Sequence, residues 1–199
     1  MTHRKTPLQL FVFSTLLLLS LLGCSLIQAS SDEQTPTEAP VSPTATEAPV
    51  SDEVMRHFEP DGGFSYIPPE GWVVDEYPGL KYMIVLAGQI GNFNPNINFL
   101  DETYSGTMEE YVSLNLDAIV QVFEEASIIS QEEFSTNEGL QGFKVVIENY
   151  QEGLQLIQIF YFFEAGDTKY IATYTRSADQ IEALDILVDQ CMKTFRFED

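Results

Sequence analysis

The strongest constraint on the fold is a set of three apolar segments near the C-terminus, joined by short polar turns. The segments span residues 143–150, 154–163 and 169–175, and Gly153 and Gly166 lie in the two connections. Segments joined by such short connections pair as antiparallel neighbours, so we expect a three-stranded meander. The middle segment is apolar on both faces from Ile157 to Phe163. This pattern is typical of a central strand that is covered on both sides.

Two segments predict helices. Thr107 and Glu110 have the spacing of a capping box, in which each side chain pairs with a free backbone amide of the other residue. The helix that follows has apolar residues at helical spacing, namely Met108, Tyr111, Val112, Ile119 and Phe123. Near the C-terminus, Ser177 is expected to cap a final helix. Its buried stripe is predicted to contain Ile181, Leu184, Leu187 or Val188, Cys191 and Phe195.

Five more segments alternate like strands and end at turn residues. They are 64–67, 72–74, 82–87, 96–100 and 127–134. Strands, a helix, more strands and a second helix favour an α+β fold over residues 54–199. We therefore expect an antiparallel sheet of about six to seven strands flanked by α-helices.

The start of this domain resembles a known family. Phe64-Ser-Tyr-Ile67-Pro-Pro-Glu-Gly71-Trp72 is similar to the opening of PsbP-like domains and of related bacterial lipoproteins such as DcrB. The order of elements is also similar, over roughly residues 58–198. The resemblance implies a PsbP-like α/β/α sandwich. PsbP itself is an extrinsic subunit of photosystem II. The Pro-x-x-Trp motif is a packing feature, so the resemblance implies the fold of this family and not its role in photosynthesis.

The N-terminus predicts an export signal over residues 1–23. Arg4 and Lys5 precede an apolar run from Leu8 to Leu22, which is shorter than the twenty or so residues of a membrane span. Leu21-Leu22-Gly23-Cys24 resembles the lipobox of bacterial lipoproteins. The resemblance implies cleavage before Cys24 and a diacylglyceryl group on its thiol. The alternative is an uncleaved signal anchor. With lipidation, we expect the domain to be anchored to the cell membrane on the extracytoplasmic side.

Residues 24–53 are expected to form a disordered tether. They are rich in Thr, Pro, Glu and Ala, and the sequence Thr37–Ser42 recurs as Thr46–Ser51. Such a composition cannot bury enough apolar surface to offset the loss of chain entropy. A flexible coil of this length spans about 30 Å, and a fully extended polyproline chain about 85 Å. The segment would hold the domain away from the membrane.

The charge balance is strongly acidic. The formal net charge is −22, and removal of residues 1–23 takes away Arg4 and Lys5 but no acid, which makes it −24. A chain of this charge repels nucleic acid and anionic lipid headgroups. Nucleic acid is therefore excluded as a partner, whereas cationic partners and simple solubility both agree with the composition.

The sequence contains few residues with catalytic chemistry. After export, His57 and Cys191 are the one histidine and the one unlipidated cysteine, and no nucleophile elbow or phosphate-binding motif is present. We therefore expect no cofactor and no metal. Acidic pairs occur at 101–102, 109–110, 124–125 and 132–133. They are expected to be solvated, although carboxylate pairs also serve glycosidases and calcium sites.

One loop is a candidate ligand or partner site. It contains three amides and an aromatic ring, at Asn92, Phe93, Asn94 and Asn96. These groups can bond to and stack on a polar ligand. The alternative is a structural turn in which Phe93 packs into the core.

Together these features predict an exported, membrane-anchored lipoprotein that is not an enzyme. Its domain would act as a binding or interaction module at the cell envelope, with an envelope protein or a small ligand as partner. The two alternatives are a carboxylate-using hydrolase of envelope glycans and a purely structural envelope protein.

Overall fold

The computed structural model describes residues 55–180 and 182–198, which form two antiparallel sheets and two helices. The larger sheet has seven strands in the order β3 (Val73–Asp75), β4 (Ile84–Leu86), β5 (Asn96–Thr103), β9 (Thr168–Ser177), β8 (Leu154–Ala165), β7 (Gln141–Gln151) and β6 (Glu124–Ser135). The smaller sheet contains β1 (His57–Glu59), β2 (Phe64–Tyr66) and β10 (Arg196–Phe197). The α+β prediction is confirmed.

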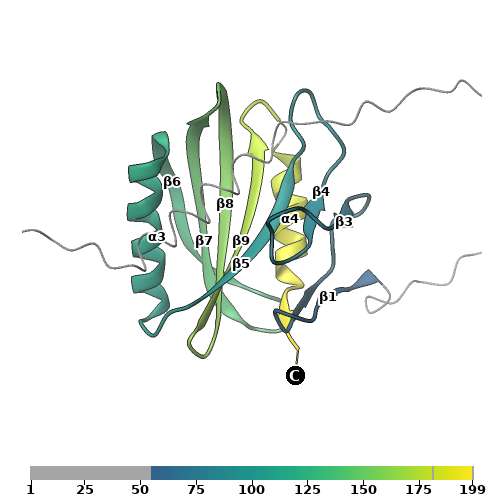
Figure 1. The fold of residues 1–199 in the computed structure, drawn as a ribbon, viewed down its shortest axis with the longest axis vertical. Coiled ribbons are helices and arrows are strands. Elements are labelled where there is room, and N and C mark those ends of the chain that lie inside the picture. The colour runs from purple at the N-terminus through teal and green to yellow at the C-terminus, as the bar shows by residue number, and fades with distance from the viewer. Residues whose placement is uncertain (1–54, 181, 199) are drawn as a thin grey trace, which may run out of the picture.

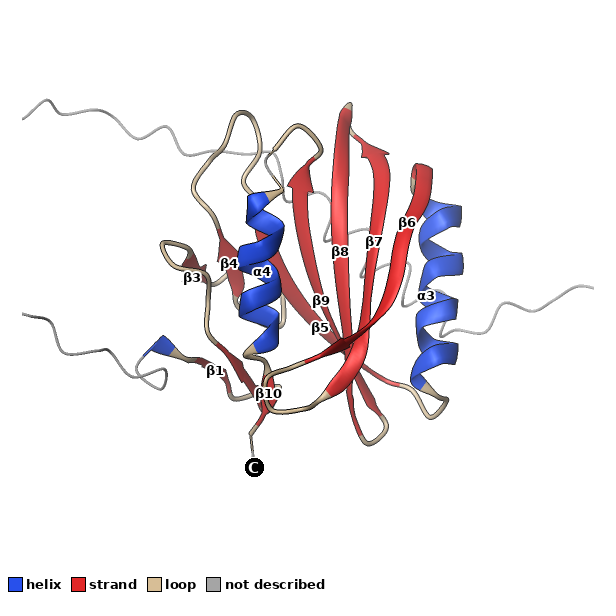
Figure 2. Ribbon diagram, turned by 180° about the vertical axis from the view of Figure 1, so that it is seen from behind, coloured by secondary structure: helices blue, strands red, loops and turns tan. Residues whose placement is uncertain are grey.

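The two helices lie on opposite faces of the large sheet. Helix α3 (Met108–Val122) lies beside the β6 edge, and α4 (Ala183–Lys193) crosses the other face near β4, β5 and β9 (Figures 1 and 2). Each helix covers its own apolar core. The core under α4 includes Tyr66, Phe99, Tyr161, Val188 and Phe195, and the core under α3 includes Val112, Ile119, Ile147, Phe160 and Phe162.

The predicted meander is present. β7 pairs with β8 and β8 pairs with β9, both antiparallel, and Phe160 on the middle strand faces Val145 on one side and Thr173 on the other. Residues 156–163 of β8 are all buried, because the two cores cover both faces of this strand. The capping box of α3 is also present. The Glu110 amide donates to Thr107 Oγ1 at 3.2 Å, and the Thr107 amide donates to Glu110 Oε2 at 3.1 Å.

The predicted start of the last helix is wrong. Ser177 is the last residue of β9, where it pairs with Leu156, and α4 begins at Ala183 without a side-chain cap. The Ser177 amide donates to Gln180 Oε1 at 3.0 Å. Gln180 therefore provides a hydrogen-bond acceptor for the last backbone amide of β9. The buried stripe passes through Val188 and not Leu187, which is 38% exposed.

The smaller sheet joins the two ends of the domain. β10 pairs with β2, and Arg56 Nη1, just before β1, donates to the backbone oxygen of Thr194 at 2.8 Å and to Ser65 Oγ at 3.1 Å. The sequence analysis did not predict β1 or β10, which are three and two residues long. The first described residues of the domain are therefore fixed to its C-terminal segment.

The predicted signal peptide, the tether and Cys24 lie outside the described residues. Within the described ranges, neither helix is long and apolar enough to cross a membrane.

Candidate functional site

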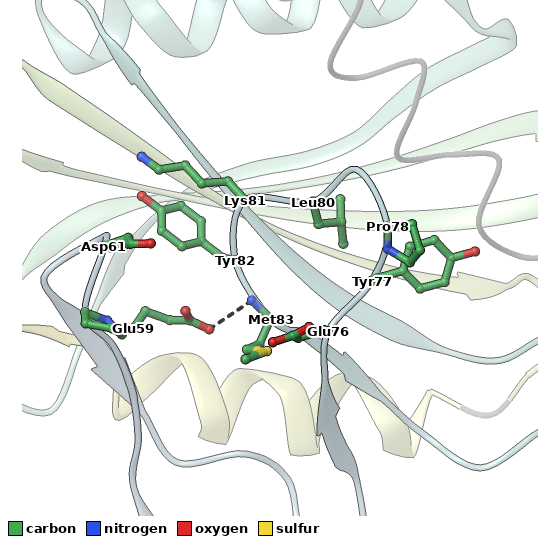
Figure 3. Close-up of a pocket in the computed structure, with 10 residues that line it drawn as sticks. Glu59, Asp61, Glu76, Tyr77, Pro78, Leu80, Lys81, Tyr82 and Met83 are labelled. Atoms are coloured by element: carbon green, nitrogen blue, oxygen red, sulfur yellow. Dashed lines mark hydrogen bonds between the residues drawn. The ribbon is translucent and has the colours of Figure 1, made fainter.

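A cavity of about 500 Å³ lies between the turn after β1 and the connection from β3 to β4 (Figure 3). Its walls come from two segments separated by some fifteen residues of sequence. Three carboxylates, two tyrosines and one lysine contribute to a lining formed by Glu59, Pro60, Asp61, Glu76, Tyr77, Pro78, Leu80, Lys81, Tyr82 and Met83.

Glu59 is the buried acid of this cavity, with 5% of its surface exposed. Its Oε1 accepts hydrogen bonds from the Met83 amide at 3.0 Å and from His57 Nε2 at 2.9 Å. In Figure 3 the Glu59 and Glu76 carboxylates lie on either side of Met83. The Met83 bond joins β1 to the β3–β4 connection, so the carboxylate is held in place before any ligand arrives.

The turn that follows Glu59 depends on glycine. The amides of Gly62 and Gly63 both donate to the backbone oxygen of Glu59, at 3.1 and 2.9 Å. A Cβ atom on Gly62 would lie 2.4 Å from the Phe64 ring, and Gly63 has a φ of +60°, which disfavours other residues. The tight turn lets Phe64 enter the core while Glu59 and Asp61 stay at the cavity.

The electrostatic character of the cavity is negative. Lys81 is the cation of the lining, but its Nζ is bound to both carboxylate oxygens of Asp101, at 2.7 and 2.9 Å. Burial alone would lower the pKa of Lys81, yet the hydrogen bond and charge of Asp101 raise it above its ordinary value. The charge of Lys81 is thus already paired with Asp101, which does not line the cavity. Glu59, Asp61 and Glu76 set the sign of the field inside.

Neutral phenols complete the wall. Tyr82 is 3% exposed, and burial together with the charge of Asp101 raises its pKa to about 12, although Lys81 opposes this shift. Behind Glu59, burial and then the Glu59 charge raise the pKa of Tyr66. Both phenols therefore remain uncharged at neutral pH, and of the two only Tyr82 lines the cavity.

The predicted loop at residues 92–96 does not gather its polar groups in one place. Asn92 is exposed, whereas Phe93 is 4% exposed and packs inward, as in the alternative interpretation. Gln180 holds the turn by donating to the backbone oxygens of Ile90 and Phe93 at 2.9 and 3.3 Å. Asn96 belongs to β5 and donates to the Asn94 backbone oxygen at 3.1 Å. A ligand role for this loop stays a prediction.

The predicted acidic pairs are separated by the fold. Glu110 caps α3, and Asp101 binds Lys81. Glu102 accepts a hydrogen bond from the Tyr111 hydroxyl at 2.6 Å, and burial raises its pKa, but it lies on β5 outside the cavity. Cys191 is 3% exposed in the core under α4, and burial raises its pKa. Within the described ranges, the acids, histidine and cysteine do not group as a metal site would require.

The comparisons with known proteins identify the fold. No protein family and no curated protein matches the sequence. Among solved structures, cyanobacterial PsbP (CyanoP) from Synechocystis sp. PCC 6803 matches with a TM-score of 0.52 and 12% identity, over 71% of this chain and 91% of that chain. The fold is PsbP-like. Two other solved structures, both of bacterial proteins, are similar in fold.

LpqN of Mycobacterium tuberculosis, described as involved in cell envelope biogenesis, matches with a TM-score of 0.53 and 10% identity, over 68% of this chain and 83% of that chain. PA94 of Pseudomonas aeruginosa, described as a protein of unknown function, matches with a TM-score of 0.50 and 13% identity, over 62% and 94% of the two chains. At these identities the similarity concerns the PsbP-like fold alone.

Sequence reasoning missed this cavity. Glu59 precedes Pro60-Asp61-Gly62-Gly63, which marks a turn, but its neighbours in sequence do not indicate that the carboxylate is buried. Its burial depends on the Met83 amide, which is 24 residues away in the chain. The one available signal was the acid-rich composition of both segments.

Proposed function

We propose that this protein is an exported, lipid-anchored envelope protein whose PsbP-like domain is a non-catalytic binding module. We further propose that the cavity at Glu59 receives a cationic group, an ammonium or guanidinium, of its partner. The observation that carries the second proposal is the buried Glu59 carboxylate, which is oriented by His57 and Met83 and accompanied by Asp61 and Glu76.

The chemistry of the cavity matches such a group. A carboxylate held in a partly desolvated wall binds a cation more strongly than an exposed one does, because less water screens the interaction. Tyr77 also lines the cavity, and a phenol ring can add cation–π attraction, whereas the Tyr82 ring already has Lys81 Nζ 4.8 Å from its centroid. The strongly negative net charge draws a cationic partner toward the domain before contact.

The anchor and tether provide the cellular part of the proposal. A lipid on Cys24 with a flexible tether would confine the domain to a thin layer beside the membrane, which raises its effective concentration for envelope partners. LpqN, an envelope biogenesis protein, shares the fold and thereby supports an envelope location.

The carboxylate-hydrolase alternative has less support. A glycosidase needs two acids on opposite sides of a sugar bond, one of them with a raised pKa. Burial raises the pKa of Glu102, but its carboxylate accepts the Tyr111 hydrogen bond on β5 and does not line the cavity. The matched PsbP-like proteins also carry no enzyme names.

Titration of the intact protein in detergent with a short lysine- and arginine-containing peptide tests the cation site. We expect a saturable heat signal and an affinity that Glu59→Gln reduces by about tenfold, equivalent to about 1.4 kcal/mol. Glu76→Gln, at an exposed position of the cavity wall, should reduce the affinity by less. Glu133→Gln, an exposed position on β6, makes the same change of charge and is expected to leave the affinity within about twofold, because surface charges contribute little. Equal losses in all three variants, or no saturable binding, would contradict the proposal.

A further inference from the structure

The large sheet ends at β6, and this strand forms a long edge. β6 is twelve residues long, whereas β3 at the opposite edge of the sheet has three. Among the described residues, β6 pairs with β7 alone. An edge strand presents a row of backbone amides and carbonyls with which another extended chain can pair. This edge lies across the sheet from the β3–β4 connection that lines the cavity at Glu59.

The middle of β6 is accessible. Every residue from Ser127 to Glu133 is exposed, although α3 lies beside the strand (Figures 1 and 2). Ile128 and Ile129 are 45% and 57% exposed. The buried residues of α3 pack instead on apolar residues of β7 and β8, such as Ile147. Helix α3 therefore covers a face of the sheet and leaves its last strand open.

The pairing of β6 with β7 gives the length of the open edge. A bulge interrupts the register between Ile128 and Ser130, and from Ser130 to Ser135 each residue of β6 lies opposite one residue of β7. In such a regular antiparallel run, alternate residues direct their amide and carbonyl groups away from the paired neighbour. An added strand thus finds a straight run of backbone partners, with the two exposed isoleucines as apolar contacts at one end.

The charge of this edge is negative. Glu125, Glu132 and Glu133 are exposed on β6, and α3 and β6 together contain no Lys, Arg or His. Lys144 of β7 is the base near them, at 3.8 Å from Glu132 Oε1. Its Nζ already donates to Asp189 Oδ2 at 2.7 Å, on α4. A positively charged chain is therefore the complement of the edge.

A second copy of the protein fits this edge poorly. Each copy would bring the same glutamates to the pairing, and like charges on neighbouring strands destabilise it. The formal net charge of −22 adds repulsion between whole molecules. We propose that the β6 edge binds a basic, extended segment of a partner protein, which adds to the large sheet as a further strand. The backbone ladder supplies the affinity and the acidic edge selects the sign of the partner's charge.

Hydrogen exchange and calorimetry on the intact protein in detergent test this inference. The probe is an end-blocked octapeptide of alternating lysine and valine. We expect saturable binding and slower exchange of the amides in residues 127–135. A peptide with the same side chains but with every backbone amide N-methylated keeps the charge and cannot form a ladder, so it should give neither effect. This comparison requires no variant of the protein.

Two matched variants locate the contact. Ile129→Lys adds a cation to the edge at an exposed position and should weaken binding of the octapeptide by about tenfold, because like charges then meet. Ile186→Lys makes the same change at a position of α4 that is 60% exposed, and it should keep the affinity within about twofold. In the Glu59→Gln protein, whose cavity binds lysine less well, the slower exchange of β6 should persist.

Three results would overturn the proposal. They are unchanged exchange in residues 127–135, equal binding of the N-methylated peptide, and equal losses of affinity in the two lysine variants. A protein that is dimeric without peptide, with amides of β6 already slow to exchange, would assign the edge to a second copy and would also refute the proposal. Because Glu59 is absent from the edge, failure of the cation cavity leaves these results interpretable.

Discussion

At the scale of single residues, Glu102 shows how burial and bonding compete at one carboxylate. It lies near the C-terminal end of β5, where the Tyr111 hydroxyl of α3 donates to it at 2.6 Å. Burial raises the pKa of Glu102, the Tyr111 hydrogen bond lowers it, and Asp101 nearby raises it, with a net upward shift. A carboxyl whose pKa is raised on folding stabilises the folded state only while it is protonated.

We therefore predict that Glu102 makes the protein less stable as the pH rises. Its contribution to the free energy of unfolding is fully present below its ordinary pKa of 4.5 and is lost as the pH rises through its higher folded value. Glu102→Gln, which keeps an acceptor for Tyr111, should remove this loss and raise the stability at pH 7. Urea unfolding between pH 4 and 8 measures the effect, with Glu133→Gln as the exposed control. A less stable Glu102→Gln protein at pH 7 would show that the charged hydrogen bond outweighs burial.

At the scale of elements, the β7–β8 pair depends on close backbone contact at Gly142. A Cβ atom there would lie 2.1 Å from the Phe162 backbone oxygen and 2.9 Å from the Phe163 ring. Backbone cannot move aside as a flexible side chain does, so the two strands would have to separate at this position. The close approach of β7 and β8 at this position therefore requires a residue without a side chain.

Gly142→Ala is expected to destabilise the protein by about 1–3 kcal/mol, the usual cost of overpacking a well-packed interior. Gly88→Ala is the matched control, because a Cβ atom at Gly88 has nothing within 4 Å. It should change the free energy of unfolding by no more than about 0.5 kcal/mol. Chemical denaturation of both variants gives the comparison, and equal stabilities would mean that the β7–β8 contact is looser than described.

At the scale of the whole molecule, the domain and its proposed attachment to the membrane are separable. The described domain has its own two cores, one under each helix, and the chain enters it at Arg56, which is bonded to Thr194 beside the C-terminal β10. The predicted lipid site at Cys24 is separated from this point by the predicted tether. Loss of the lipid should therefore change the location of the protein and leave its fold intact.

Cys24→Ala is expected to move the protein from the membrane fraction to the soluble fraction. Burial of acyl chains contributes about 0.8 kcal/mol for each methylene group, and the apolar run from Leu8 to Leu22 is too short to replace that anchor as a comfortable membrane span. Cys191→Ala is the control and should stay with the membranes, since this thiol is buried in the core. Fractionation followed by immunoblotting gives the result. A wild-type protein in the soluble fraction, or an anchored Cys24→Ala protein, would contradict lipidation.

The local elements and the class of fold follow from patterns between residues that are close in the chain. Alternation and short turns predicted the meander, and Thr107 with Glu110 predicted the start of α3, because these signals act between residues close in the chain. The prediction failed at Ser177, where pairing with Leu156 extended β9 and displaced the start of α4. A strand neighbour on the far side of a turn outweighed the local preference of serine for a helix cap.

The position of the candidate site depends on contacts between segments that are remote in the chain. Glu59 became a buried acid because the Met83 amide, from a distant segment, meets its carboxylate. Asn98 became a buried amide because the pairing of β5 with β9 places Thr173 opposite it inside the sheet. Burial, pairing and pKa depend on the distances between side chains that are remote in sequence. No local sequence pattern contains those distances, so the burial, pairing and pKa of these side chains could not be predicted before the packing was known.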